Sequence, residues 1–242
     1  MIDPRIDLLD RSLFENKHIL DIGCNTGNIC IALAKKYNVA SVHGIDIDEK
    51  LIYKAQKNLR IAYSLENPHK QTDDAIDLSF RFHYFPQSMT NMFGLMPMAL
   101  PPTLESEKKN QYPYNVHFET LDWIATKEAE HANHYDTILA LSITKWIQLH
   151  HGDKGLKSFF KKIYDSLAPG GTFVLEPQDF DTFQKRAKEI NPSKNVQEEL
   201  EFRPEHYTDF LINKLGFKEY HDLGIPKGEV KGFSRPVLIY IK

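Results

Sequence analysis

The sequence lacks the features that mark extracellular and membrane-spanning proteins. It contains only two cysteines, Cys24 and Cys30, both in one short motif. Neither a disulfide framework nor a four-cysteine zinc site is therefore expected, and a reducing compartment suits the chain better. No apolar run approaches the roughly 20 residues of a membrane-spanning helix. The first 18 residues include acidic side chains where a signal peptide needs a basic start and an apolar core, so the chain is expected to be intracellular.

A net positive charge and metal-ligating clusters are also lacking. The net charge is −3 and the isoelectric point is about 6.4, so binding to nucleic acid would require a local basic patch. The pairs His131 with His134 and His150 with His151 lack cysteine or clustered carboxylate partners, and no metal site is predicted. The share of hydrophobic residues, 41%, is typical of a folded globular protein rather than a disordered one.

Hydrophobic patterns predict strands that alternate with helices, which is typical of a doubly wound α/β fold with a mostly parallel sheet. Seven strands are expected, at residues 18–23, 41–48, 116–120, 135–143, 172–177, 217–225 and 236–242. The last two strands are expected to form an antiparallel hairpin. Residues 67–114 break the pattern and contain Pro101-Pro102, so they are interpreted as an irregular insertion into a single domain spanning residues 1–242.

The first strand is followed by a nucleoside-binding pattern. It ends at Gly23, a helix follows Gly27, and Asp46 lies 23 residues after Gly23 at the end of the next strand. An acid at this offset is suited to bind ribose hydroxyls. Asn25 replaces the glycine that a pyrophosphate requires, which favours S-adenosylmethionine (SAM) over a dinucleotide. The alternatives are an ordinary structural turn for the loop and a helix cap for Asp46, while Asp48 is suited to cap the next helix.

Two further strand ends carry side chains that could bind a cofactor or a substrate. Asp122-Trp123 follows the third strand and could bind an adenine, or could simply cap a helix beside a core tryptophan. The run Leu139–Gly155 is interpreted as an apolar strand that passes into a polar loop. It would present Ser142, Thr144 and Lys145 to the reactive methyl of SAM.

Hydroxyls and a cation at this position suit an anionic acceptor. A terminal phosphate is already ionised near neutral pH and requires positioning rather than a general base. The alternative is that Lys145 only extends from a strand end into solvent.

Six motifs in order, LDIGCNTGN, GIDID, LSITKW, HHGDKGL, LAPGGTFVLEPQ and KGFSRPV, resemble the methylphosphate capping enzyme (bicoid-interacting protein 3) family. The resemblance implies a Rossmann-like class I methyltransferase that uses SAM, releases S-adenosyl-L-homocysteine and methylates the 5′ (gamma) phosphate of small non-coding RNA. It covers about residues 19–60, 116–178 and 228–237. The insertion at 67–114 shows no such resemblance.

The resemblance also implies roles for individual residues. Lys145 falls on the lysine that holds the 5′ phosphate, with Ser142 and Thr144 beside it. The family's cofactor contacts fall on Arg5, Gly23, Cys24, Asn25, Asp46, Ile47, Asp122, Trp123 and Leu141. In the loop KGFSR, alternation would place Lys231, Phe233 and Arg235 on one face, where two cations and an aromatic ring can bind RNA. The alternative for this loop is a solvated hairpin turn.

One departure from the family qualifies the expected activity. Members carry a tyrosine- and arginine-rich segment before the first strand, whereas the 17 residues before His18 contain no tyrosine. Slow turnover, or a largely non-catalytic RNA-binding role in a small nuclear or telomerase-type ribonucleoprotein, is therefore the alternative. A small-molecule methyltransferase is a third hypothesis, favoured by the acidic isoelectric point. The resemblance further implies a nuclear, monomeric protein with La-related RNA-binding proteins as candidate partners.

Overall fold

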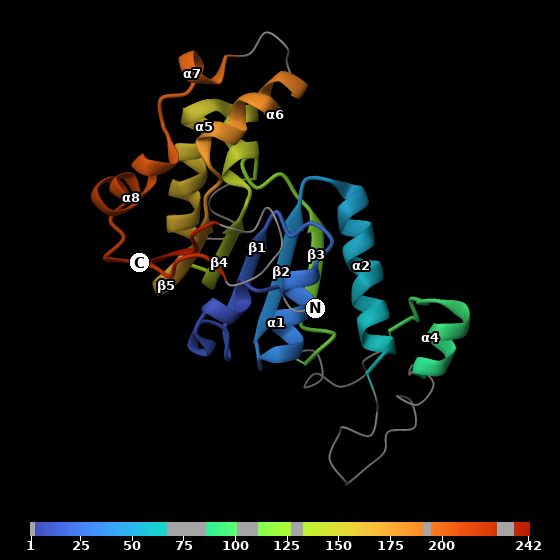
Figure 1. Ribbon diagram of the computed structural model, residues 1–242. Helices are drawn as coiled ribbons and strands as arrows, with labels where there is room; N and C mark the ends of the chain where they lie inside the picture. Colours follow the sequence, from blue (N-terminus) through green and yellow to red (C-terminus); the bar gives the residue numbers. More distant parts are fainter. Residues whose placement is uncertain (1–2, 67–85, 101–110, 127–132, 191–194, 227–234) are drawn as a thin grey trace.

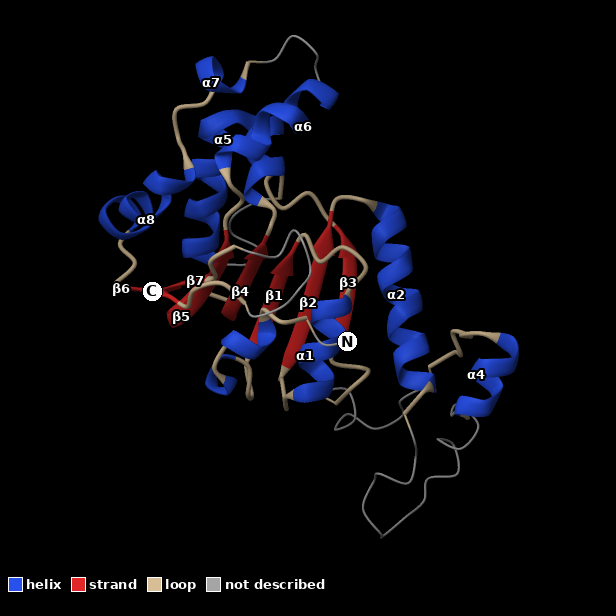
Figure 2. Cartoon of the chain, in the orientation of Figure 1, coloured by secondary structure: helices blue, strands red, loops and turns tan. Residues whose placement is uncertain are grey.

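The structure is a computed structural model, and it describes residues 3–66, 86–100, 111–126, 133–190, 195–226 and 235–242. Seven strands form one sheet in the order β3-β2-β1-β4-β5-β7-β6 (Figure 2). The strands are β1 (His18–Ile22), β2 (Ser41–Asp46), β3 (Val116–Thr120), β4 (Tyr135–Leu141), β5 (Leu167–Glu176), β6 (Glu219–Asp222) and β7 (Leu238–Ile241). Strands β1 to β5 run parallel to one another, and β7 is antiparallel to both β5 and β6. The predicted sheet and its antiparallel C-terminal pair are therefore confirmed.

Helices cover both faces of the sheet (Figure 1). The principal helices are α1 (Asn28–Lys36), α2 (Glu49–Ser64), α4 (Gln87–Phe93), α5 (Thr144–Ser166), α6 (Phe183–Ile190), α7 (Val196–Glu199) and α8 (Tyr207–Asp209). A π-helical segment, Phe210–Leu215, continues α8, and short 3-10 turns lie at Ile6–Leu8, Arg11–Leu13, Phe180–Thr182 and Pro204–His206. Within the described residues, no helix is both long and apolar enough to cross a membrane.

Alternation along the buried strands divides the core into two layers. Ile138 and Ala140 of β4 pack with α5 and the C-terminal helices, whereas Leu139 and Leu141 pack with α1 and α2. Both layers are apolar because a strand covered by helices on both faces has no solvent-facing side. The β-strand ends that carry the predicted motifs are fixed by this double burial.

The prediction of a polar loop after β4 is wrong, because the helix α5 begins at Thr144 and runs to Ser166. Gly152 breaks the helix with φ 65° and ψ −170°, a conformation that side chains other than hydrogen rarely allow. Asp153 then accepts the backbone N–H groups of Glu201 and Phe202, both at 2.9 Å. The HHGDKG segment is therefore a helix kink anchored to a later segment rather than an open loop.

The predicted insertion is only partly described, since residues 67–85 and 101–110 lie outside the described ranges. Its described part contains α4, which lies beyond α2 and away from the sheet (Figure 1). The single-domain assignment for residues 1–242 stays a prediction.

Candidate active site

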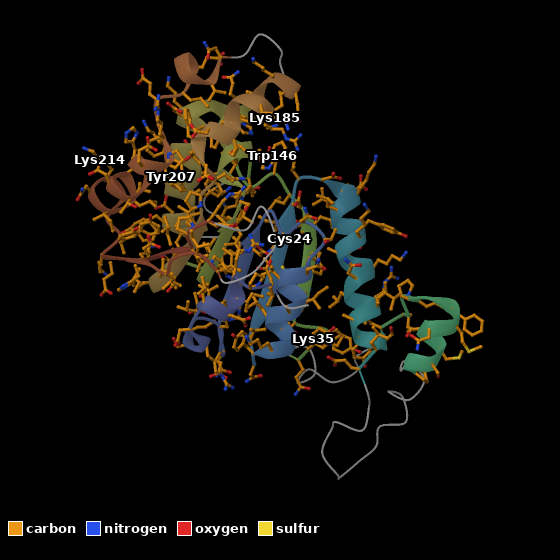
Figure 3. The ribbon with its side chains drawn as sticks, viewed as in Figure 1. Cys24, Lys35, Trp146, Lys185, Tyr207 and Lys214 are labelled. Carbon is orange, nitrogen blue, oxygen red and sulfur yellow. The ribbon has the colours of Figure 1, made fainter. Side chains whose placement is uncertain are left out.

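A cavity of about 1110 Å³ lies at the carboxyl ends of β1–β4, the edge where open α/β sheets bind ligands. Its wall includes all nine predicted cofactor residues: Arg5, Gly23, Cys24, Asn25, Asp46, Ile47, Asp122, Trp123 and Leu141. Segments far apart in the sequence therefore meet at one site. Figure 3 labels Cys24 in the loop between β1 and α1, and Trp146 at the start of α5.

The loop between β1 and α1 is held tightly against its neighbours. Gly23 has φ +77°, and a Cβ there would lie 2.5 Å from Cδ1 of Ile143. Gly23 and Cys24 both donate their backbone N–H groups to the carbonyl of Ile45, at 2.8 and 3.0 Å. Asn25 also has a positive φ, 52°, which asparagine tolerates better than most residues. The glycine pattern therefore reflects a close approach of the loop to β2 and to the β4–α5 junction.

Asp46 connects this loop to the end of β2. Its Oδ2 accepts the backbone N–H of Asn25 at 3.0 Å, and its Oδ1 accepts that of Asp48 at 3.1 Å. Asp48, not Asp46, caps α2 by accepting the N–H of Lys50 at 2.8 Å. The helix-cap alternative for Asp46 is therefore excluded, and its carboxylate lines the cavity beside Ile47, whose side chain is 67% exposed.

The Asp122-Trp123 pair fits the capping alternative directly and also lies in the cavity wall, so its binding of an adenine stays a prediction. Oδ1 of Asp122 accepts the N–H groups of Ile124 and Ala125 at 3.0 and 3.3 Å, so the carboxylate caps its own turn. Both residues also line the cavity. Lys162 of α5 lies beneath the indole, with Nζ 4.5 Å from its centroid, and donates hydrogen bonds to the carbonyls of Trp123 and Thr126. A buried cation thus holds the loop in place.

A buried charge network lies at the other end of the cavity. Glu176, at the end of β5, is fully buried, and its Oε2 accepts Nη1 of Arg5 and Oγ of Ser142, both at 2.6 Å. Arg5 also pairs with Asp3 at 2.7 Å. Burial alone would lower the pKa of Arg5, but these two carboxylates outweigh it and raise the pKa. Nη1 of Arg235 donates to Oγ of Ser142 at 3.0 Å, so Ser142 links Glu176 to a second guanidinium.

The SITKW and EPQ motifs contact each other directly. Oε1 of Gln178 accepts Oγ1 of Thr144 and the backbone N–H of Lys145, both at 3.0 Å, and Nε2 donates to the carbonyl of Ser142. Gln178 therefore caps the first turn of α5 in place of a conventional N-cap side chain. The expected RNA contact by Thr144 is corrected, because its hydroxyl is fully buried in this cap.

Lys145 does not lie where the sequence placed it. Because the chain turns into α5 at Thr144, the cavity is lined by Ser142, Ile143 and Trp146, whereas Lys145 points toward the next element. Its Nζ donates to Oγ1 of Thr182 at 3.2 Å. Partial burial lowers the pKa of Lys145, and the nearby cations Arg235 and Arg186 lower it further.

Several site residues were missed from the sequence. Asp3, Trp146, His150 and His151 line the cavity, and Glu176 and Gln178 organise it. The spacing of Ile143, Ile147 and His150 is that of one helix face. A helix predicted to begin at Thr144 would therefore have placed these residues together, facing the cavity. Two predicted RNA contacts, Lys231 and Phe233, lie outside the described residues, whereas Arg235 reaches the cavity. Among the described residues, no group of three or more His, Cys, Asp or Glu side chains could hold a metal ion.

Comparisons with known proteins agree with this geometry. Residues 135–242 match the family model of bicoid-interacting protein 3, and residues 19–105 match a methyltransferase domain. The chain is 34% identical to a U6 snRNA methylphosphate capping enzyme of Drosophila melanogaster, over 99% of this chain and 68% of that protein. It is 32% identical to a probable RNA methyltransferase of Arabidopsis thaliana, over 99% of this chain and 74% of that protein. The 7SK snRNA methylphosphate capping enzyme of Homo sapiens is 31% identical, and this chain spans only 37% of its length.

Solved structures support the fold. The N-methyltransferase NodS of Bradyrhizobium japonicum, in complex with S-adenosyl-L-homocysteine, aligns with a TM-score of 0.54 at 14% identity, over 98% of this chain and 84% of that chain. A SAM-dependent methyltransferase of Methanosarcina mazei aligns with a TM-score of 0.51 at 18% identity, over 100% and 96% of the two chains. The predicted class I SAM-dependent methyltransferase fold is thus confirmed, and the chain belongs to the bicoid-interacting protein 3 family.

Proposed function

We propose that this protein transfers the methyl group of SAM to a 5′ phosphate of a small non-coding RNA. The capping enzymes among its relatives act on small nuclear RNA according to their names, and a third relative is a probable RNA methyltransferase. The observation that carries the proposal is the guanidinium of Arg235, held 3.0 Å from Ser142 in the cavity wall next to the end of β4. A cation at the acceptor end suits an anionic substrate.

The adenosine end of SAM fits the residues at the ends of β2 and β3. Asp46 would bind the ribose hydroxyls, and Ile47 with Asp122 and Trp123 would enclose the adenine. A dinucleotide fits less well, because the N–H of Asn25 is already donated to the carboxylate of Asp46. A pyrophosphate at this point would meet a negative charge instead of free backbone donors.

The amino-acid end of SAM fits the loop after β1. Gly23, Cys24 and Asn25 together with Leu141 would form the backbone surface around it, and Arg5 would bind its carboxylate. Arg5 is held by Asp3 and Glu176, so its guanidinium needs little reorganisation on binding. When bound, SAM supplies an electrophilic methyl group and leaves as S-adenosyl-L-homocysteine.

The acceptor requires positioning rather than deprotonation. A terminal phosphate has a second pKa of about 6, so one of its oxygens is already a nucleophile at neutral pH. Arg235 would bind and orient this phosphate, and its bond to Ser142 fixes the direction of the guanidinium. Exclusion of water by the buried β4 end would strengthen this attraction.

Lys145 is proposed to supply a second charge to the phosphate. Its ammonium group donates one hydrogen bond, to the exposed Thr182. A lysine has four rotatable bonds, so turning toward the phosphate would exchange this single bond for a charge-assisted one. The repulsion by Arg235 and Arg186 that lowers its pKa would be relieved by a phosphate dianion.

The test is transfer of labelled methyl from SAM to a hairpin RNA with a 5′ triphosphate, monophosphate or hydroxyl end. Label is expected only on the phosphorylated ends. Lys145→Ala should lower kcat/KM by roughly 10-fold or more, as loss of a charged hydrogen bond predicts. The matched control is Lys214→Ala, which removes an exposed lysine far from the cavity (Figure 3).

The alternatives give different results in the same assay. RNA binding without methyl transfer would indicate a non-catalytic assembly subunit, and the absence of salt-sensitive RNA binding would favour a small-molecule acceptor. Nuclear localisation, La-related partners and a monomeric state belong to the same proposal and stay predictions.

A further inference from the structure

Trp146 is placed unlike the other tryptophan of the chain. Trp123 is 4% exposed, whereas the indole of Trp146 is 37% exposed and still forms part of the cavity wall. It lies in the first turn of α5, one residue after Lys145 and four after Ser142. A partly exposed ring in the cavity wall is available to a ligand as well as to solvent.

The indole is held by the helix that lies across it. The guanidinium carbon of Arg186, on α6, is 4.5 Å from the ring centroid, and Arg186 also pairs with Glu189. The helix itself is anchored by Phe183 and Ala187, both fully buried. Figure 3 shows Trp146 on α5 close to Lys185 on α6 at the upper edge of the sheet. The ring is thus a fixed surface rather than a loose side chain.

The charge around this ring is mainly positive. Arg186 contacts the indole, and both Arg186 and Arg235 lower the pKa of Lys145 by more than Asp179 and Glu189 raise it. Aromatic rings next to cations are typical of sites that bind single-stranded nucleic acid, since the ring stacks on a base and the cations bind the backbone. An adenine of SAM would lie at the opposite end of the cavity, beside Ile47 and Asp122.

We propose that Trp146, held in place by Arg186, is a stacking site for the base of the 5′-terminal nucleotide of the RNA. This inference rests on the proposed function, because it places the first base beside the phosphate that Arg235 and Lys145 would bind. An unpaired first base suits the site best, because an unpaired base can turn out of the helix and reach a ring in the cavity wall. Stacking is tolerant of base identity, so any of the four bases is expected to bind.

The test combines a protein variant with an RNA variant. Affinity for a 5′-triphosphate hairpin with an unpaired first nucleotide is measured by fluorescence anisotropy, alongside methyl transfer. Trp146→Ala should weaken binding roughly 5- to 150-fold, the range measured for one stacked base. An RNA with an abasic first nucleotide should weaken binding to the unmodified protein by a similar factor. Combining the two changes should cause little further loss, because both remove the same contact.

Conservative variants separate stacking from folding. Trp146→Phe should retain most of the affinity, Arg186→Gln should lose part of it, and Lys214→Ala should match the unmodified protein. Thermal unfolding midpoints establish that each variant is folded. The inference is overturned if the losses from Trp146→Ala and the abasic RNA multiply, or if Trp146→Ala raises the KM for SAM and leaves RNA affinity unchanged.

The two proposals fail in distinguishable ways. If no methyl is transferred but the two binding losses still coincide, RNA methylation is wrong and the stacking site stands. If methyl transfer is normal and the abasic RNA binds and reacts as well as the complete one, the stacking site is wrong and the proposed function stands.

Discussion

Asp21, buried beneath the loop after β1, should make the protein less stable as the pH rises. Its side chain is 2% exposed, and burial raises its pKa to about 6 from 3.8, although Cys30 donates a hydrogen bond to it at 3.2 Å. The unfolded chain therefore releases this proton at lower pH than the folded chain. Between about pH 4 and pH 6 the folded state binds more protons, so stability falls as pH rises through this window and then levels off.

The magnitude follows from the two pKa values. A difference of 6 minus 3.8, about 2 units, corresponds to about 3 kcal/mol at neutral pH, of which about 2 kcal/mol develops between pH 4.5 and pH 7.5. Asp21→Asn retains a hydrogen-bond acceptor for Cys30 but cannot ionise. The stability of the variant relative to the unmodified protein should therefore rise by about 2 kcal/mol across this range.

Urea unfolding at pH 4.5 and pH 7.5 for both proteins measures this double difference, which cancels the other titrating groups. Asp10→Asn is a control that should show almost no change across this range. Hydrogen bonds with the side chain and the backbone N–H of Ser12 lower the pKa of Asp10 below its ordinary 3.8, so its contribution to stability changes only below about pH 4.5. A relative stability of Asp21→Asn that is equal at both pH values would refute the assignment of a buried, ionisable carboxyl at this position.

Three further substitutions test the site. Gln178→Ala should lower the free energy of unfolding by about 2–4 kcal/mol in urea titrations, because it leaves the buried start of α5 without its cap. Gln178→Glu keeps the acceptor but loses the donor to the carbonyl of Ser142 and buries a charge, so it should also destabilise the fold. Gly27→Ala should cost about 3 kcal/mol in the same assay, because Gly27 has φ +74° and a Cβ would lie 2.5 Å from Cζ of Phe118. Lys162→Met should raise the dissociation constant for SAM, measured by calorimetry, by roughly 10-fold, because Lys162 holds the loop that carries Trp123. An unchanged dissociation constant would mean that this loop does not contribute to SAM binding.

The cofactor end of the site could be predicted because its signals are local. The pattern spans fewer than 30 residues and consists of the β1 strand, Gly23, Gly27 and Asp46. The backbone of a strand–turn–helix requires each of these features locally. Tertiary context did not override these requirements, and Gly23 and Asp46 line one cavity. Arg5, Asp122, Trp123 and Leu141 lie outside this stretch, and they were expected at the site from the family resemblance and from their places at strand ends. The strands were equally predictable, since burial on both faces requires continuous apolar runs.

The acceptor end could not be predicted as well because its structure depends on contacts between distant segments. The first turn of α5 has no N-cap side chain of its own, and Gln178, 34 residues after Thr144, supplies the acceptor instead. From the sequence alone, the polar run before Gly152 resembles a loop, since glycine interrupts the helical pattern and the cap is absent. The EPQ motif belongs to the family resemblance, but its role as a helix cap depends on β5 lying beside β4.

Lys145 illustrates why a motif can identify a residue without fixing its direction. At the end of a strand, Lys145 would point into the cavity. Because a helix begins at Thr144 instead, Lys145 turns toward Thr182, which lies 37 residues later in the sequence. The same turn brings Trp146 to the cavity wall, so one change of secondary structure exchanges the positions of two functional side chains. Under the proposed function, Trp146 and Arg235 already line the cavity, whereas Lys145 would have to turn away from Thr182 to reach a bound phosphate.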